Sequence, residues 1–228
     1  MRERDAIEAV AAIHDPVRAA LYEFVRATAA PVTRDAAAAA LALPRSTVAF
    51  HLDRLVASGV LTVEYRRLTG RTGPGSGRPS KVYSTADAEL SVSIPPRRDD
   101  LMGGLLASAI EVAAADGSPV LDALRTTAER AGRAAGSEAG SLGAVLDETG
   151  YEPHASEAAA AADEPGVVLS NCPFHHLVDR HAGVVCAANH AFLCGAAAAS
   201  GTDPERVLLD PAPGRCCVRI AAAERATA

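Results

Sequence analysis

All five cysteines of the chain lie within its last quarter, and their side chains are the residues best suited to site chemistry. They are Cys172, Cys186, Cys194, Cys216 and Cys217. In a reducing compartment, clustered cysteines bind metals, carry redox chemistry or pack as small apolar groups more often than they form structural disulfides. The clustering therefore predicts a metal, iron-sulfur or redox site in the carboxy-terminal part of the chain.

The spacing of Cys172 and Cys186 allows their sulfur atoms to meet. Cys172 follows a predicted strand and precedes Pro173, so it lies at a strand-to-helix turn, where backbone amides can point at a sulfur. Thirteen residues then separate it from Cys186. This gap has room for one helix, a turn at residues 181–183 and the start of a second helix. We expect these two cysteines to form the centre of the site.

The remaining cysteines are expected to contribute unequally. Cys216 and Cys217 are predicted to begin a strand, in which neighbouring side chains point to opposite faces, so only one can face the site. Cys216 is preferred because it shares its face with the apolar Val218. Cys194 lies eight residues after Cys186, roughly 12 Å along a helix axis, and is expected to be core.

The sequence leaves the fourth ligand and the bound species open. Three thiolates and one weaker ligand could hold a [4Fe-4S] or [2Fe-2S] cluster, and three thiolates with a histidine could hold zinc. His190 lies one helical turn after Cys186, so both could serve one site. The residues that could fill the fourth position are His175, His176, Asp179 and His190.

The first 92 residues have the pattern of a winged helix-turn-helix. One amphipathic helix is predicted over residues 16–26, and a second runs from the capping residue Thr33 to Leu41. After a break at residues 42–44, a third helix is expected over residues 45–58 and ends at Gly59. Two strands, residues 60–65 and 81–84, enclose an arginine- and glycine-rich loop that would form the wing.

Polar residues on the third helix and the wing are predicted to contact DNA. The helix would present its amino-terminal polar residues to base edges, and the wing would place an arginine in the minor groove. The predicted DNA-binding residues are Arg45, Ser46, Thr47, His51, Arg54, Arg66, Arg67, Arg71, Arg78 and Lys81.

Two sets of motifs carry a resemblance to known regulators. Residues 15–85, with LPRSTVAFHLDRLVASGVL and GRPSKVYS, resemble the winged helix-turn-helix of ArsR and DeoR-like bacterial regulators. The full layout, in which NCPF, VC, Asn189-His190 and PGRCC follow that module, resembles the SufR-type iron-sulfur regulators. This resemblance implies that Cys172, Cys186 and Cys216 or Cys217 bind a cluster, whose loss or oxidation releases the operator of cluster-assembly genes.

Charge and composition divide the chain into two domains. Residues 1–98 carry 14 Lys+Arg and 10 Asp+Glu, whereas residues 99–228 carry 8 and 18. The basic part can approach phosphates and the acidic part would be repelled by them. We therefore predict a DNA-binding domain (1–92), a linker (93–100) and an α+β sensor and dimerisation domain (101–228), with two or three helices over residues 101–146.

The expected partner is an operator, most simply an inverted repeat bound by a homodimer through helices near residues 1–13 or 101–115. The chain lacks a leader-like segment, and no apolar run approaches the roughly 18 residues that span a bilayer, so a cytoplasmic location is expected. No phosphate loop, HExxH motif or serine elbow predicts an enzyme. The alternatives are a regulator that senses zinc, thiol oxidation or an apolar small molecule.

Overall fold

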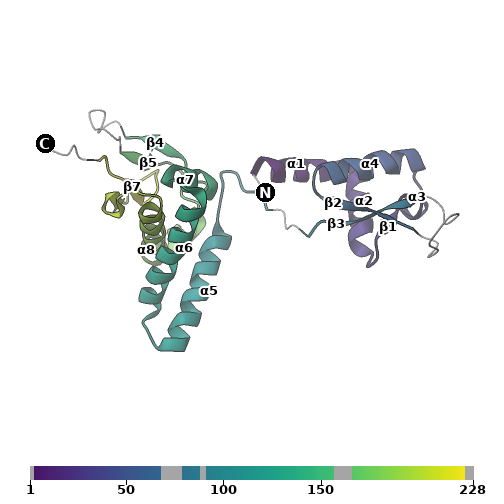
Figure 1. The fold of residues 1–228 in the computed structure, drawn as a ribbon. Helices are drawn as coiled ribbons and strands as arrows, with labels where there is room; N and C mark the ends of the chain where they lie inside the picture. Colours follow the sequence, from purple (N-terminus) through teal and green to yellow (C-terminus); the bar gives the residue numbers. More distant parts are fainter. Residues whose placement is uncertain (1–2, 68–78, 88–90, 157–165, 224–228) are drawn as a thin grey trace. The chain divides into compact units, whose positions relative to one another are not determined.

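The protein divides into two compact units, residues 1–92 and 93–228, each with its own hydrophobic core. The computed structural model describes residues 3–67, 79–87, 91–156 and 166–223. Both units combine helices with a small antiparallel sheet (Figure 1). The predicted α+β class is therefore confirmed.

Helices make up most of the first unit, and their ends lie where local sequence signals predicted them. The helices are α1 (Glu3–Ile13), α2 (Pro16–Ala27), α3 (Arg34–Leu41) and α4 (Arg45–Ala57). The Asp15 carboxylate caps α2 by accepting hydrogen bonds from the amides of Val17 and Arg18, both at 3.0 Å. Thr33 caps α3 in the same way, through the amide of Ala36.

The turn between α3 and α4 and the end of α4 complete the helix-turn-helix. Ala42 has a φ of 52°, which turns the chain after α3 so that α4 can begin after Pro44. Gly59 follows α4 with a φ of 74°, a conformation that costs glycine little. The core beneath these helices includes Leu21, Val48 and Leu52, all with no exposed surface.

A three-stranded sheet in the order β1-β3-β2 closes the first unit. Its strands are β1 (Val32–Thr33), β2 (Leu61–Arg66) and β3 (Ser80–Thr85). Strands β2 and β3 pair antiparallel from Leu61 opposite Thr85 to Arg66 opposite Ser80. These two strands form the predicted hairpin, and the tip of the wing lies outside the described residues.

The second unit begins with three consecutive helices. They are α5 (Asp99–Asp116), α6 (Val120–Ala139) and α7 (Leu142–Thr149). Helix α6 starts directly after Pro119, as its sequence predicted. The longest helix, α8 (His175–Ala199), follows later in the chain and packs along α6.

Glycines allow the backbones of α6 and α8 to touch. A Cβ added to Gly132 would lie 1.8 Å from the carbonyl oxygen of Phe192, and one at Gly195 would lie 2.0 Å from that of Glu129. Gly136 meets the carbonyl oxygen of Ala196 in the same way, at 2.4 Å. The glycines of α6 therefore serve close helix packing rather than a loosely structured segment.

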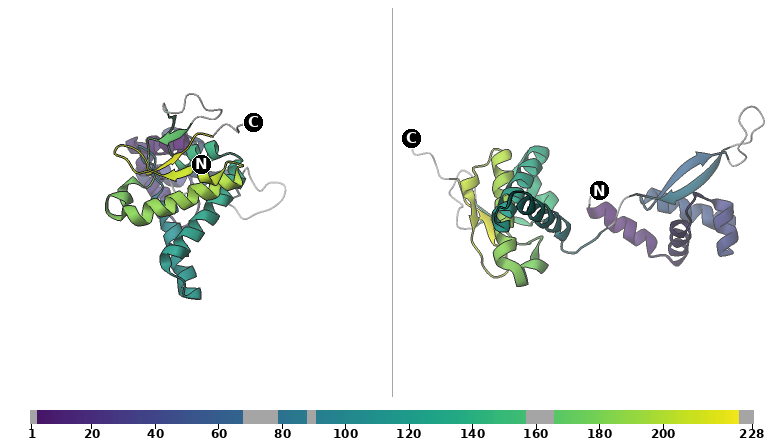
Figure 2. Two further views of the ribbon diagram at one scale, coloured as in Figure 1. Left: turned by 90° about the vertical axis from the view of Figure 1, so that its left-hand side faces the viewer. Right: turned by 90° about the horizontal axis from the view of Figure 1, so that it is seen from below.

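A four-stranded antiparallel sheet in the order β4-β5-β7-β6 completes the second unit. Its strands are β4 (Pro153–Ala155), β5 (Val167–Leu169), β6 (Val207–Leu209) and β7 (Val218–Ile220), and the short 3-10 helix η2 (Pro204–Arg206) precedes β6. Strands β6 and β7 pack against α8, and Figure 2 shows these yellow strands beside the green helices. The sheet thus positions the segment that directly precedes β7 next to α8.

Helix α8 differs from expectation in two respects. It continues through the predicted turn with a kink at His181, whose φ and ψ are −133° and 32°. It also contains an 18-residue window with a mean hydropathy of 1.5, so it is long and apolar enough to cross a membrane by length and composition. The expectation that no apolar run reaches this length is therefore wrong. More than half of that window, 56%, is buried inside the unit.

The segment predicted as a linker belongs to the second unit. The amide of Arg98 donates to the carbonyl oxygen of Pro173 at 2.9 Å, and the Arg97 guanidinium donates to the Asn171 side chain. Helix α5 then begins at Asp99. Residues 97 and 98 are thus anchored to the loop that carries Cys172.

Candidate functional site: the recognition helix and a buried thiol cluster

Helix α4 presents an exposed face that matches part of the predicted DNA-binding surface. Arg45, Ser46 and Arg54 are exposed and Thr47 is half-buried, while Val48, Leu52 and Leu55 hold the opposite face in the core. Arg45 forms an ion pair with Asp35 at 2.7 Å, and both side chains stay well exposed. Exposed ion pairs contribute little energy, so Arg45 can exchange this partner for a phosphate.

His51 does not belong to this exposed face. Its side chain is only 14% exposed, and its Nδ1 atom lies 3.8 Å from the carboxylate of Asp15, the cap of α2. The ring also packs edge-on against Phe50. The contacts of His51 thus lie inside the unit, and its predicted contact with DNA stays a prediction.

Lys81 is likewise engaged within the unit. The Asp53 carboxylate on α4 accepts hydrogen bonds from Lys81 at 2.9 Å, from the Tyr83 hydroxyl at 3.0 Å and from Arg34. Burial alone would raise the pKa of Asp53, but the hydrogen bonds from Lys81 and Tyr83 and the charge of Arg34 lower it below its usual value. Lys81 therefore fixes β3 to α4 rather than extending freely toward DNA.

The wing arginines are only partly described. Arg66 and Arg67 are exposed at the end of β2, with Arg66 paired to Glu64 at 2.8 Å. Arg71 and Arg78 lie outside the described residues. Their predicted contacts with DNA remain predictions.

Phe50 is a surface residue that the sequence reasoning missed. Phe50 is 59% exposed and lies in the middle of α4, one helical turn before the exposed Arg54. An exposed aromatic ring on a recognition helix can contact the methyl group of thymine. The signal was available in the sequence, because Phe50 falls off the apolar stripe of Val48, Leu52 and Leu55.

Four of the five thiols lie together in the second unit. Cys172 is placed by the turn between β5 and α8, Cys186 by α8, and the pair Cys216 and Cys217 by the segment before β7. The cysteines are free thiols; Cys216 and Cys217 are buried, with 1% and 8% of their surface exposed. These four are the cysteines that were predicted as ligands, and their role as ligands stays a prediction.

The prediction that only one of Cys216 and Cys217 faces the site assumed that both residues belong to a strand. Strand β7 begins at Val218, so the alternation of a strand does not apply to the two cysteines. Cys216 forms a hydrogen bond with Cys172, and Cys217 forms hydrogen bonds with Cys216 and Cys186. Both sulfurs therefore belong to the cluster.

Cys216 is the sulfur that holds negative charge most readily. The hydrogen bonds from Cys172 and Cys217 lower the pKa of its thiol, against the opposing effect of burial. The same hydrogen bonds to Cys216, together with burial, raise the pKa values of Cys172 and Cys217. Among these three sulfurs, Cys216 is therefore the one that gains most from its neighbours as hydrogen-bond donors.

Amide groups add further donors to these sulfurs. The Asn189 side chain donates to Cys216 at 3.3 Å and lies 3.9 Å from the sulfur of Cys217. The backbone amide of Val218 also donates to Cys216, and that of Phe174 to Cys172. Amide hydrogen bonds to cysteine sulfurs stabilise thiolates and are a recurrent feature around metal and iron-sulfur ligands.

Asn189 is itself held in place by a buried hydroxyl. The Tyr151 hydroxyl donates to the Asn189 side-chain oxygen, and the two residues are 2% and 1% exposed. Burial raises the pKa of Tyr151 well above its ordinary value, so the hydroxyl keeps its proton. This orients the Asn189 amide nitrogen toward the sulfurs.

The sulfur contacts connect Cys172 to Cys216, Cys216 to Cys217, and Cys217 to Cys186. Within the described ranges, no three His, Cys, Asp or Glu side chains converge in an arrangement that could hold a metal ion as they stand. The donor set has the chemistry that an iron-sulfur cluster requires, with four cysteines and several amide donors. Cluster binding would replace the hydrogen bonds between sulfurs with iron-sulfur bonds.

Cys194 and two of the histidines that could fill the fourth position, His176 and His190, have other partners, whereas His175 lines a pocket together with Cys172. His190 contacts the carbonyl oxygen of Val207 at 2.9 Å and the sulfur of Cys194 at 3.6 Å, rather than sharing a site with Cys186. His176 pairs with Asp99 at 3.7 Å, and Asp179 is exposed. The ring of His190 thus contacts strand β6 and Cys194, and neither of these contacts supports a site shared with Cys186.

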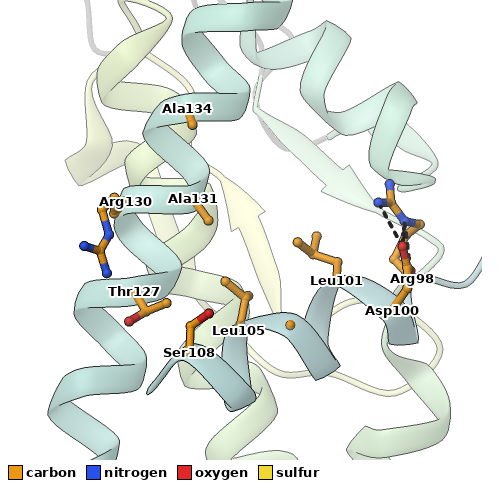
Figure 3. Close-up of a pocket in the computed structure, with 10 residues that line it drawn as sticks. Arg98, Asp100, Leu101, Leu105, Ser108, Thr127, Arg130, Ala131 and Ala134 are labelled. Atoms are coloured by element: carbon orange, nitrogen blue, oxygen red, sulfur yellow. Dashed lines mark hydrogen bonds and ion pairs between the residues drawn. The ribbon is translucent and has the colours of Figure 1, made fainter. Parts of the chain in front are cut away.

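A groove between α5 and α6 is a second concave feature of this unit. It has a volume of about 590 Å³ and a mainly apolar lining that includes Leu101, Leu105 and Ala131 (Figure 3). The Thr127 side chain also lines it, with 6% exposure and a hydroxyl that has no hydrogen-bond partner in the described part of the chain. Figure 3 shows Arg98 paired with Asp100 at one end of the groove.

Comparison with known proteins identifies the first unit. Residues 13–64 match the family model of a helix-turn-helix domain. These residues contain α2, α3, α4 and the start of the wing. A search of curated proteins gives no match, and a search of solved structures gives none. The chain therefore carries an amino-terminal helix-turn-helix domain, the DNA-binding module of transcriptional regulators.

Proposed function

We propose that this protein is a cytoplasmic transcriptional repressor whose second unit binds an iron-sulfur cluster that controls operator affinity. Cys172, Cys186, Cys216 and Cys217 would be the ligands. The carrying observation is that four cysteines from three separate segments form one connected set of sulfur contacts. Cysteines that serve only in packing do not need to contact one another through their sulfur atoms.

The electrostatics around the sulfurs support this proposal. Bound thiolates need donors that offset their negative charge, and Asn189, Val218 and Phe174 supply amide donors to two of the four sulfurs. The cluster, when bound, would supply sensitivity to oxidation and to iron supply. The resemblance to SufR-type regulators, through NCPF, VC and PGRCC, points in the same direction.

The test is purification without oxygen, followed by iron and sulfide analysis and a visible absorption spectrum. We expect a coloured protein with iron and acid-labile sulfide in equal amounts. The variants Cys172→Ser and Cys186→Ser should lose both, whereas Cys194→Ser should keep them, since Cys194 contacts His190 rather than the other thiols. Colourless wild-type protein that resists anaerobic reconstitution would disprove cluster binding.

Zinc and bare thiol oxidation give different outcomes in the same experiment. Zinc would leave the protein colourless, with one metal ion that a chelator removes. A bare thiol switch would contain no metal, and its operator affinity would change with oxidant and recover with reductant. Operator binding measured with and without the cluster then shows which state represses.

A homodimer on an inverted repeat is part of the proposal. On α5, the residues Gly103, Ala107, Ile110 and Ala114 are all exposed and recur at spacings of four, three and four. This spacing is typical of the contact face between two packed helices. Ile110 is the large apolar side chain of this face and is 58% exposed. Ile110→Asp should give a monomer in sedimentation, whereas Leu209→Asp, at an exposed residue on β6, should not. The exposed Ile7 and Val10 of α1 form the alternative surface.

The groove between α5 and α6 supports a second candidate function, control by an apolar small molecule. Its volume lies in the usual range for ligand sites, and Thr127 offers a buried hydroxyl without a partner in the described residues. In this case Cys172→Ser would leave control of operator affinity intact, whereas Ala131→Phe, which fills the groove, would abolish it.

A further inference from the structure

A second pocket opens directly beside the thiol cluster. Its volume is about 320 Å³, and Cys172 is part of its wall. The pocket lies between the loop that carries Cys172 and the loop that ends at Arg215, the residue before Cys216. A molecule in this pocket would therefore contact the cluster from its solvent side.

Two arginines make the pocket cationic within an otherwise acidic unit. The guanidinium of Arg97 donates to oxygens of Pro96, Asn171 and Cys172, and no carboxylate among the described residues pairs with it. Arg215 binds Asp210 through Nη2 at 2.8 Å, while its Nη1 is buried without a partner in the described structure. The pocket thus offers guanidinium donors that suit a small carboxylate.

An acidic residue, Glu152, also lines the pocket. Glu152 is exposed, and its carbonyl oxygen accepts a hydrogen bond from the amide of Ser170, which also lines the pocket. The residues that line this small pocket thus include two arginines, a glutamate and a cysteine. These are the groups that would recognise a carboxylate, an ammonium group and a sulfur atom, respectively.

We propose that this pocket binds a small zwitterionic amino acid that carries a thiol or disulfide, with free cysteine or its disulfide as the simplest form. The ligand carboxylate would lie at Arg97 and Arg215, its ammonium group at Glu152 and its sulfur beside Cys172. This site adds a direct chemical input to the proposed sensor. The exchange needs a free Cys172 thiol and therefore belongs to the metal-free protein, and it rests on the pocket rather than on cluster binding.

The disulfide form can react with Cys172 in a balanced exchange. The Cys172 sulfur bonds to one sulfur of the bound disulfide while the sulfur-sulfur bond of the ligand breaks. The proton of the Cys172 thiol passes to the departing sulfur, and one molecule of free cysteine leaves. The product is a mixed disulfide at Cys172.

The test uses reduced, metal-free full-length protein treated with limiting cystine, followed by peptide mass mapping. We expect Cys172 to be modified at least ten times faster than Cys194, which is also partly buried but lies outside the pocket. In calorimetry, reduced cysteine should bind, while alanine and 2-mercaptoethanol, which lack the thiol or the charged groups, should bind at least ten times more weakly.

Variants separate recognition from simple reactivity. Arg215→Gln and Glu152→Gln should each slow the modification of Cys172 about tenfold, and Glu152 is exposed, so its change leaves the core intact. Arg219→Gln is the matched control, because Arg219 also binds Asp210, at 2.7 Å, but does not line the pocket. Equal labelling of Cys172 and Cys194, or unchanged rates in the first two variants, would overturn the proposal. Since the protein is metal-free, failure here is separate from failure of cluster binding.

Discussion

The side-chain amide of Asn189 donates a hydrogen bond to the sulfur of Cys216 over 3.3 Å, and both residues are 1% exposed. A buried sulfur that carries negative charge depends on such donors, since water cannot replace them. The relationship makes Asn189 the residue outside the cysteines that most directly affects the cluster.

Replacing Asn189 with leucine should therefore change both stability and thiol chemistry. The substitution leaves the Tyr151 hydroxyl and the Cys216 sulfur without this partner, which costs about 1–3 kcal/mol in the free energy of unfolding. Loss of the donor should also raise the pKa of Cys216. Urea unfolding and ultraviolet thiolate titration of metal-free protein measure the two effects. Tyr151→Phe, which keeps the donor, should shift the titration less.

The glycines between α6 and α8 should tolerate no side chain. Gly132→Ala places a methyl group into the backbone of Phe192, so we expect a loss of more than about 3 kcal/mol in unfolding free energy. Gly143→Ala, in α7, meets nothing within 4 Å and should be neutral or stabilising by up to about 1 kcal/mol. Similar unfolding midpoints for the two variants would contradict the close packing of these helices.

The Asp53 network should make the stability of the first unit depend on pH. The pKa of Asp53 is lowered in the folded state, so its stabilising effect is present above the ordinary value of 3.8 and is lost as pH falls through the folded pKa. Because Asp53 is 46% exposed, we expect Asp53→Asn to cost only about 1 kcal/mol at neutral pH. Thermal unfolding of both proteins should show this difference shrinking below about pH 4.

Arg54 and Phe50 should affect DNA binding in different ways. Arg54→Ala should weaken binding to every sequence and reduce the salt slope of the affinity by about one, as expected for a phosphate contact. Phe50→Ala should leave the salt slope unchanged and reduce preference for thymine at one position by about 1 kcal/mol. Fluorescence anisotropy at several salt concentrations distinguishes them. A reduced slope in Phe50→Ala would show that its effect is not a base contact.

Local signals in the sequence predicted most of the first unit. The caps Asp15 and Thr33, the break at Pro44 and the stop at Gly59 all act through neighbouring residues, so the sequence alone contains them. The contacts of His51 and Lys81 with Asp15 and Asp53 could not be predicted, because these partners are distant in sequence. Helical periodicity shows which face is polar but not which polar side chains already have partners.

The thiol cluster was predictable in its members and less so in its geometry. Cys172 and Cys186 were expected to meet across a turn between two helices, whereas one kinked helix, α8, joins them and their sulfurs are connected through Cys216 and Cys217. The arrangement of Cys216 and Cys217 depended on whether β7 began at residue 216 or 218, because strand alternation applies to the two cysteines only in the first case. The contact of His190 could not be predicted, because nothing in the sequence near it shows that β6 would pack against its ring.

The contact between the backbones of α6 and α8 has a mechanical consequence. With no side chains between Gly132, Gly136 and the carbonyl oxygens of α8, the two helices cannot slide or tilt against each other without a clash. A displacement of α8 that begins at Cys186 would also move α6. Helix α5 packs against α6 and would move with it. Chemistry at a few sulfur atoms would thereby become motion of a whole helical layer.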